Sequence, residues 1–357
     1  GRVGGDEFVL ILNDQSNEEI IYRAMQRISQ KVSEPIVIDG KELYVTCSAG
    51  ISIYPQDGRD VDTLLKNADA AMYRAKDHGR SNFQFYTSEM NERVNERLAL
   101  ENALRRALER QELMLHYQQK VSLRSGQIVG AEALVRWLHP EWGLVRPARF
   151  IPLAEETGLI VSIGEWVLRE ACRQSRAWLD AGLDPGVVSV NLSVRQFRQE
   201  GLVRTVSRIL EETRLDPAQL EMELTESMVM GNVDQAIAVL QGLKQLGVTL
   251  SVDDFGTGYS SLSYLKDLPI DTLKIDRSFV RDIGSGDEAD DGVLAQAIIS
   301  LGHALHLKVI AEGVETDAQM RFLRRHACDE VQGFFYGEPL PPEQHGKLLE
   351  KARRKAR

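Results

Sequence analysis

Seven polar residues of this chain each stand at the end of a separate short apolar run. They are Glu132, Asn191, Glu223, Asp253, Lys274, Glu312 and Gln332. Buried strands that finish on a carboxylate, an amide or a lysine are typical of a barrel whose site collects at the carboxyl ends of its strands. Seven such endings in order, with helix-like segments between most of them, predict a ring of polar side chains at one rim.

The oxygen-bearing members of this ring favour a hard divalent cation. The candidate metal ligands are Glu132, Asn191, Glu223, Asp253, Asp254 and Glu312. Oxygen donors without histidine or cysteine select Mg²⁺, Mn²⁺ or Ca²⁺ over zinc. Because converging carboxylates repel one another unless cations lie among them, the set implies more than one ion. Two metals ~3.5–4 Å apart are a standard arrangement for cleaving a phosphodiester.

The adjacent aspartates Asp253 and Asp254 need a turn directly after them. Successive strand residues point to opposite faces, so both carboxylates reach one rim only if the chain turns at once. The segment 255–258, with the sequence Phe-Gly-Thr-Gly, is predicted to supply that turn. Ser260 or Ser261 is then expected to cap the following helix.

Three further charged residues are candidates for supporting roles. We expect Lys274 to orient the attacking water and to offset the carboxylates, with a strand-end ion pair to Asp276 as the alternative. Glu226 lies three positions after Glu223, which reverses its strand face, so we expect it to hold a neighbouring loop. Arg136 is a candidate phosphate ligand, with an ordinary surface arginine as the alternative.

The elements that position these residues alternate between strand and helix from Glu112 onward. Strands are expected near 113–118, 128–134, 187–192, 220–224, 248–253, 271–275, 307–312 and 330–334. Helices are expected over Ser162–Ala181, Leu202–Thr213, Asp234–Leu246, Leu294–Leu305 and Ala318–Arg325. Eight strands with intervening helices predict an α/β fold, a (β/α)8 TIM-type barrel over 111–357.

The link between the first two strands, LRSGQ, is too short for a helix and contains Ser-Gly. We therefore expect a hairpin there, which makes the first strand antiparallel to its neighbour. A doubly wound open sheet is the alternative architecture.

Residues 1–86 form a separate compositional unit. The runs FVLILN and YVTCSAGISIY indicate strands, an amphipathic helix follows the first of them, and a second helix over 61–79 is predicted to be closed by Gly79. This is the pattern of a partial α+β domain without its first half.

A connecting helix is predicted over 87–110, with Ser88 as its N-cap. Its apolar stripe is Met90, Val94, Leu98, Leu104 and Leu108. A helix packed on the following domain and a lever that carries a signal are the two interpretations.

Composition excludes several classes of protein. The formal net charge of −10 argues against a nucleic-acid duplex as partner. No run approaches the ~20 apolar residues of a membrane span, and no signal peptide is recognisable. The three cysteines lie far apart without CxxC spacing, as expected for reduced thiols of a cytoplasmic protein. The opening GRVGGDEF begins in mid-pattern, so the parent protein has room for a sensor or membrane anchor upstream.

The motifs together resemble those of the EAL-domain cyclic-di-GMP phosphodiesterases. EALVRW, NLS, ELTES, DDFGTGYSSL, LKIDRSFV, AEGVE and QGFFYG occur in that family's order over about 98–345. The resemblance implies that the six candidate ligands hold metal and that Lys274 and Glu315 serve the attacking water or support the ligands. It also implies substrate contacts from Gln118, Leu134, Arg136 and Gln332. Gln119 is a departure, since the family usually has proline there.

The start of the chain resembles a second family. Residues 4–8, Gly-Gly-Asp-Glu-Phe, match the signature of diguanylate cyclase (GGDEF) domains, and ADAAMYRAKDHGR is similar to that family's last helix. The earlier half of such a domain is absent from this sequence, so we expect no synthesis of cyclic-di-GMP.

These observations lead to one functional hypothesis and two alternatives. We expect a phosphodiesterase that opens cyclic-di-GMP to linear pGpG with two Mg²⁺ or Mn²⁺ ions, and that forms a homodimer through its barrel, as the family commonly does. The alternatives are a catalytically silent cyclic-di-GMP receptor and the regulatory barrel of a diguanylate cyclase.

Overall fold

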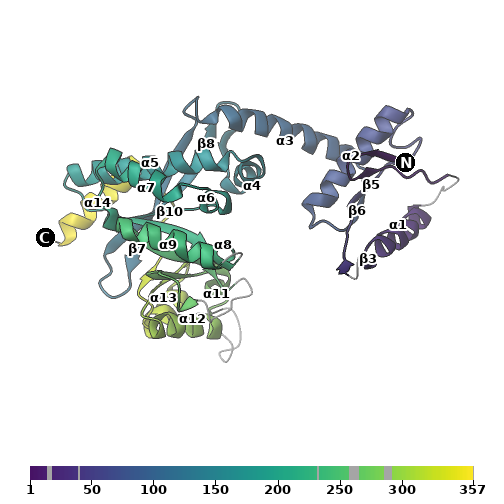
Figure 1. The fold of residues 1–357 in the computed structure, drawn as a ribbon. Coiled ribbons are helices and arrows are strands. Elements are labelled where there is room, and N and C mark those ends of the chain that lie inside the picture. The colour runs from purple at the N-terminus through teal and green to yellow at the C-terminus, as the bar shows by residue number, and fades with distance from the viewer. Residues whose placement is uncertain (14–17, 39–40, 231–232, 257–264, 285–291, 357) are drawn as a thin grey trace. The chain divides into compact units, whose positions relative to one another are not determined.

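The computed structural model describes residues 1–13, 18–38, 41–230, 233–256, 265–284 and 292–356. The chain forms two compact units, Gly1–Asn102 and Ala103–Arg357 (Figure 1). The second unit carries all of the candidate site residues.

Eight strands of the second unit close into a barrel. They are β7 (Leu113–Ser122), β8 (Ile128–His139), β10 (Val187–Asn191), β11 (Leu220–Thr225), β12 (Thr249–Phe255), β13 (Thr272–Ile275), β14 (Lys308–Ala311) and β15 (Glu330–Val331). β7 is antiparallel to both of its barrel neighbours, β8 and β15, and the other barrel pairs are parallel. The predicted TIM-type barrel with an antiparallel first strand is confirmed, and closure through β8 and β10 rules out the open sheet.

Helices fill most connections between the strands. They are α4 (Pro147–Thr157), α5 (Ile160–Asp180), α6 (Val194–Phe197), α7 (Leu202–Thr213), α8 (Glu226–Met230), α9 (Val233–Leu246), α11 (Arg277–Arg281), α12 (Val293–Ala304), α13 (Asp317–Arg325) and α14 (Pro342–Ala356), with a short strand β9 (Gly143–Val145) after β8. The five predicted helices are present. The sequence prediction missed α4, which contains Pro152, and α14, whose strongly charged sequence hides its apolar face.

Side-chain alternation makes the inside of the barrel polar. Along β11, Glu221 and Glu223 point inward, whereas Met222 and Leu224 point outward to the helices. The inward side chains of neighbouring strands are likewise polar: Gln118, Lys120, Glu132, Ser189, Asn191, Ser251, Asp253, Thr272 and Lys274.

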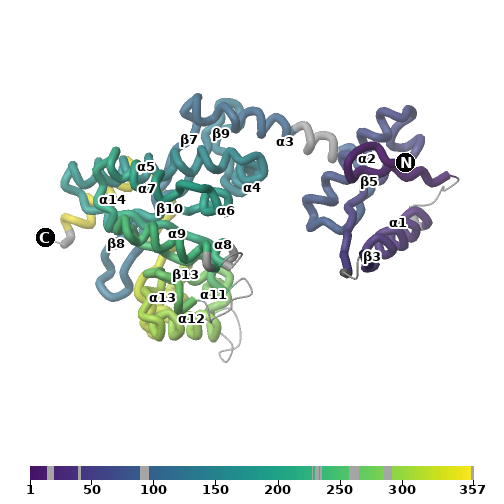
Figure 2. Tube along the Cα trace, viewed as in Figure 1, coloured from purple at the N-terminus to yellow at the C-terminus, as the bar shows by residue number. Residues whose placement is uncertain are grey.

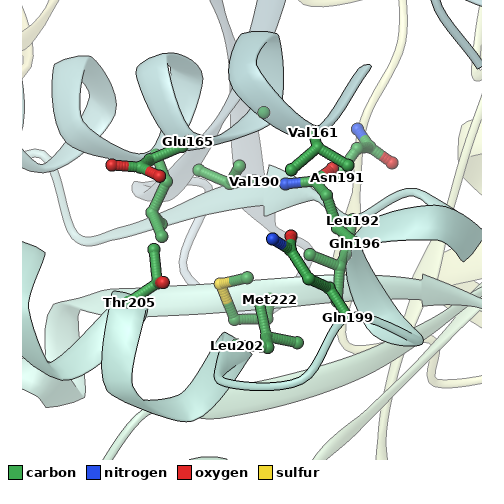
Figure 3. A pocket seen from close by; sticks show the side chains of 12 residues that line it. Val161, Glu165, Val190, Asn191, Leu192, Gln196, Gln199, Leu202, Thr205 and Met222 are labelled. Atoms are coloured by element: carbon green, nitrogen blue, oxygen red, sulfur yellow. The ribbon is translucent and has the colours of Figure 1, made fainter. Parts of the chain in front are cut away.

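The outer face of the barrel is apolar and covered by helices. Val190 and Met222 face a small pocket between β10, α5 and α7, and six of its twelve lining residues have apolar side chains (Figure 3). On another side, α14 packs beside α5 (Figure 2), where the rings of Trp178 and His345 lie 5.2 Å apart. These helix contacts bury the outward halves of the strands, which is what the hydrophobic core of a barrel requires.

The first unit contains β1 (Arg2–Gly4), β2 (Glu7–Phe8), α1 (Glu18–Val32), β3 (Ile36–Ile38), β4 (Lys41–Leu43), β5 (Ala49–Ile51), α2 (Val61–Asp77) and β6 (Phe83–Phe85). The α2 helix crosses β5 at Gly50, where a Cβ would lie 1.8 Å from the carbonyl oxygen of Ala68. Only glycine allows this close approach of the two backbones.

Two predicted strands of the first unit are shorter than expected. Within FVLILN, strand structure ends at Phe8, and within YVTCSAGISIY it covers only Ala49–Ile51. Val9 still exchanges backbone hydrogen bonds with Gly1, but no described strand pairs with Leu10 and Ile11, which are exposed. An apolar run forms a strand only where a partner supplies backbone hydrogen bonds.

The connecting helix is α3 (Ser88–Ala107). Its buried side chains are Leu100, Leu104 and Ala107, whereas Leu98 of the predicted stripe is 53% exposed. The side chains of Met90 and Val94 lie outside the described part. The buried stripe of α3 therefore contains Leu100, two positions after Leu98, and Leu98 itself lies on another face of the helix. No helix in the described ranges is both long enough and apolar enough to cross a bilayer.

Candidate active site

The ammonium of Lys274 lies at the centre of the ring. The residue is fully buried, and its Nζ is 2.6 Å from Glu223 Oε2, 3.2 Å from Asp253 Oδ2 and 2.6 Å from Glu312 Oε1. The contact to Glu312 is at ion-pair distance but lacks hydrogen-bond alignment. The alternative partner, Asp276, instead caps α11 by accepting from the Ser278 amide at 3.0 Å.

Amide side chains surround Glu132 on the other side of the ring. Asn191 Nδ2 donates to Glu132 Oε1 at 2.6 Å, and Gln332 Nε2 donates to Glu132 Oε2 at 2.5 Å. Gln332 Nε2 also donates to Gln118 Oε1 at 3.1 Å. Glu132, Asn191, Gln118 and Gln332 are therefore one hydrogen-bonded group, although they come from four different strands or strand ends.

Asp254 lies at an irregularity near the end of β12, which continues to Phe255. Asp254 has φ +55°, the register of β12 against β13 shifts between Val252 and Phe255, and the Asp254 amide donates to Asp253 Oδ1 at 2.9 Å. The left-handed backbone of Asp254 breaks the side-chain alternation within the strand, and Gly256, with φ +95°, begins a turn inside the predicted segment 255–258. Thr257 and Gly258 of that segment lie outside the described residues. The predicted helix caps Ser260 and Ser261 lie outside the described residues.

Glu226 is the first residue of α8, and it is buried. β11 ends at Thr225, so the direction of the Glu226 side chain follows from helix geometry and not from strand alternation. Its Oε2 accepts a hydrogen bond of 3.3 Å from the Gly256 amide, directly after β12. This contact is what an anchor of the following segment requires. Thr257, the other anticipated partner, is outside the described residues.

Leu134 and Arg136 lie on the face of β8 that carries Glu132, two and four residues further along the strand. Both are half-buried, and Arg136 Nη1 donates to the Val135 carbonyl at 2.9 Å. Glu315, in contrast, is exposed, and within the described chain its carboxylate has no hydrogen bond or ion pair. The structure therefore does not bring Glu315 into the ring.

The electrostatics of the ring are uneven. Burial alone would raise the pKa of Glu223, but the ammonium groups of Lys120 and Lys274 lower it to about 2. Burial raises the pKa of Glu312 to about 8, opposed by Lys274 and reinforced by repulsion from Asp253. The neighbouring carboxylates hold the pKa of Lys274 well above its usual value in spite of burial, so this lysine stays charged.

Two protein-family models match this chain, and one of them covers the residues of the ring. The family model described as the EAL domain matches residues 101–339, which include the whole ring. The chain belongs to the EAL family. A second family model, described as the diguanylate cyclase, GGDEF domain, matches residues 1–82.

Two relatives from Pseudomonas aeruginosa match nearly the whole chain, including both the GGDEF and the EAL regions. The bifunctional diguanylate cyclase/cyclic di-GMP phosphodiesterase MucR of Pseudomonas aeruginosa is 48% identical over 96% of this chain and 50% of its own length. The cyclic di-GMP phosphodiesterase NbdA of the same organism is 46% identical over 95% of this chain and 43% of its own length. The chain thus spans about half the length, or less, of these relatives.

A solved structure resembles the EAL barrel directly. The structure described as the PaMucR phosphodiesterase in complex with c-di-GMP superposes with a TM-score of 0.67 at 52% identity. It covers 69% of this chain, and this chain covers 99% of it.

The donor set of this EAL barrel fits hard divalent cations. Three buried carboxylates, those of Glu132, Glu223 and Asp253, meet the partly buried Glu312 at the rim. Burial raises the pKa of Glu132, Asp253 and Glu312, so their charged forms are disfavoured unless a cation beyond Lys274 lies among them. Gln332 Oε1 is buried without a partner among the described residues, which leaves a further oxygen donor. Among the described residues, no group of three or more Asp, Glu, His or Cys side chains is arranged to hold a metal ion. The ammonium of Lys274 lies between the ring carboxylates.

Two interior residues escaped the sequence prediction. Lys120 lies two positions after Gln118 on β7, and Glu221 lies two positions before Glu223 on β11, so each shares a strand face with a predicted site residue. Lys120 Nζ is 2.7 Å from Glu221 Oε1. Their parity with Gln118 and Glu223 was the available signal. Both residues lie in the middle of a strand, whereas the pattern that predicts the site consists of polar residues at strand ends.

Proposed function

We propose that this chain is a metal-dependent phosphodiesterase that hydrolyses cyclic-di-GMP to linear pGpG. The observation that carries the proposal is the buried cluster of Lys274 with Glu223, Asp253 and Glu312 at the barrel rim, with Glu132 and Asn191 beside it. No expected ligand is missing from the sequence. The names of MucR and NbdA, and the c-di-GMP complex of the related barrel, support the choice of substrate.

The ligands proposed for two Mg²⁺ or Mn²⁺ ions are Glu132, Asn191, Glu223, Asp253, Asp254 and Glu312. Such ions, when bound, lower the pKa of water and offset phosphate charge. Glu132 and Glu223 already have hydrogen-bonded oxygens, so amides and ammonium groups pre-orient them before any ion arrives.

Around these ligands, the proposed substrate contacts are Gln118, Leu134, Arg136 and Gln332. Water attacks one phosphorus, the bond from phosphorus to the 3′-oxygen breaks, and the product retains a 5′-phosphate. Because Lys274 stays protonated, we assign it the role of a donor that orients water and offsets charge, and exclude it as a base. Glu226 supports the segment after Asp254. Glu315, exposed as it is, retains its proposed supporting role only on the family resemblance.

The test is chromatography of cyclic-di-GMP incubated with the protein and Mg²⁺, Mn²⁺, Ca²⁺ or a chelator. We expect pGpG with Mg²⁺ or Mn²⁺, little with Ca²⁺, whose looser coordination positions water poorly, and none with the chelator. Binding of cyclic-di-GMP without turnover under Mg²⁺ would establish the receptor function instead.

The remaining expectations are part of the same proposal. We propose a partial GGDEF domain over 1–86, a connecting helix over 87–110 and the EAL barrel over 111–357, acting in the cytoplasm as a homodimer through the barrel. The three cysteines are free, which fits a reducing compartment. Light scattering after gel filtration tests the dimer.

A further inference from the structure

A second polar layer lies directly beneath the ring. Its centre is Lys120, whose Nζ is 2.7 Å from Glu221 Oε1 and 2.8 Å from Glu223 Oε1. Lys120 is 3% exposed, Glu221 6% and Glu223 1%. Glu221 Oε2 in turn accepts from Thr272 Oγ1 at 3.2 Å. The layer thus joins three strands, β7, β11 and β13, across the inside of the barrel.

This layer is costly for stability alone. A buried ion pair often contributes no more than well-packed apolar side chains would, because both charges lose their hydration. A barrel interior is normally filled with branched apolar residues, which would serve packing equally well here. The arrangement therefore calls for another explanation, and its contact with the ring gives one.

Glu223 is the link between the two layers. Lys120 donates to its Oε1 from below, and Lys274 donates to its Oε2 at 2.6 Å within the ring. Each Glu223 oxygen thus has its own ammonium donor, and Lys120 holds the oxygen that faces away from the ring. Glu221 carries the compensating charge and fixes Lys120, so the pair adds no net charge to the site.

We propose that Lys120, held by Glu221, is a positioning residue that orients Glu223 for metal binding. The inference rests on the proposed function, in which Glu223 is a metal ligand. Groups that hydrogen-bond a ligand from behind set its direction, and their loss typically costs about 10- to 100-fold in metal affinity or activity.

The test uses the double variant Lys120→Met/Glu221→Gln, which removes the pair without changing the net charge. Mn²⁺ binding is measured by titration calorimetry and by the Mn²⁺-dependent rise in melting temperature, neither of which needs turnover. We expect a folded protein whose Mn²⁺ dissociation constant is raised about 10- to 100-fold. The Mn²⁺ concentration for half-maximal hydrolysis should rise in parallel.

Lys244→Met is the matched control. Lys244 Nζ pairs with Asp271 at 2.8 Å on the outside of the barrel, near the amino-terminal end of β13. Its loss removes an ion pair of the same length and should leave Mn²⁺ affinity within about twofold of the unaltered protein. A shift as large as that of the double variant would show a general loss of rigidity and overturn the proposal.

Two other results for the folded double variant would also overturn the proposal. Unchanged Mn²⁺ binding would show that Glu223 does not depend on Lys120 for its orientation, and tighter binding would show that Lys120 competes with the ion for Glu223. Should that variant not fold, Thr272→Val removes only the hydrogen bond behind Glu221. It should weaken Mn²⁺ binding about two- to fivefold, and unchanged binding would count against the proposal.

The outcomes separate this inference from the proposed function. Weaker Mn²⁺ binding in the double variant, with no hydrolysis by the unaltered protein, would sustain the role of Lys120 and refute the phosphodiesterase. Absence of Mn²⁺ binding by the unaltered protein would refute the role of Lys120 itself.

Discussion

At the scale of single residues, Gln119 shows how this chain accommodates a departure from its family. The side chain donates from Nε2 to the Tyr336 carbonyl at 2.6 Å, next to the bond from Gln118 Nε2 to the Gly337 carbonyl at 3.1 Å. Two consecutive amides thus hold the segment that follows Gln332. A proline at position 119 would have no such donor. Strand β7, which has no proline, continues past the site to Ser122.

Gln119→Met keeps the volume of the side chain and removes the donor. Loss of one hydrogen bond of about 1 kcal/mol should loosen the segment after Gln332, raise KM for cyclic-di-GMP about fivefold and leave kcat within about twofold. Steady-state kinetics measure both constants. An unchanged KM would show that the neighbouring Gln118 contact holds the segment by itself.

Replacement of Lys274 separates chemistry from binding. Lys274→Ala leaves Glu223, Asp253 and Glu312 without their shared cation, so we expect a loss of at least about 100-fold in kcat. Cyclic-di-GMP affinity, measured by calorimetry with Ca²⁺ present, should change only about threefold. Equal losses of rate and affinity would mean that Lys274 binds the substrate and does not assist the reaction.

At the scale of elements, the sequence predicts the strands and helices that have regular apolar patterns. It does not predict features that depend on a single residue or on contacts between distant strands. The eight strands and five long helices have regular apolar patterns, and the structure has them all. The irregularity of β12 at Asp254 depends on one left-handed residue, which periodicity does not reveal. The contacts of Lys120 join positions 101 and 103 residues apart, so only the closed barrel brings them together. How the side chains of the ring pair is likewise a property of closure and not of spacing.

Glu226 tests the link between two elements, the start of α8 and the end of β12. Glu226→Ala removes the acceptor of the Gly256 amide, so the segment after Asp254 loses an anchor. KM and the Mn²⁺ requirement should rise together, as they do when a segment that completes a site is loosened. Kinetics at several Mn²⁺ concentrations measure both, with circular dichroism as the check of folding. Kinetics identical to the unaltered protein would remove the anchor role.

His345 makes the docking of α14 sensitive to acid. Burial lowers its pKa to about 4, against an unfolded value near 6.5. The unfolded chain therefore binds more protons than the folded chain between these values, and the free energy of unfolding falls as pH drops through that window. By pH 5 the loss from this group is about 2 kcal/mol. His345→Phe should reduce the difference in urea stability between pH 7 and pH 5 by that amount, and an unaltered difference would contradict it.

At the scale of the whole molecule, the two units differ in completeness. The EAL barrel is closed and has every proposed ligand, whereas the described part of the GGDEF unit has only short two-stranded sheets, with Asp6 and Glu7 of its signature exposed. The relatives that share both units are about twice as long or longer, so their activities do not transfer to this chain as a whole.

Incubation with GTP and Mg²⁺ should therefore yield no cyclic-di-GMP. The comparison is with a barrel made of Ala103–Arg357 alone, and Glu132→Ala in both proteins prevents the product from being consumed. Product above the barrel-only level, detected by mass spectrometry, would show that the first unit holds more of a cyclase than its sequence indicates.

The reversed direction of β7 decides where the polypeptide enters the barrel. In an all-parallel barrel the first strand starts at the floor, opposite the substrate. Here Leu113 pairs with Trp137 at the upper end of β8, and Glu112 Oε2 accepts from the Trp137 indole at 3.0 Å. The segment that follows α3 therefore meets β8 at Trp137, the neighbour of Arg136 in the sequence. Under the proposed function, the entry point of the chain and the proposed phosphate contact Arg136 would therefore share one end of β8.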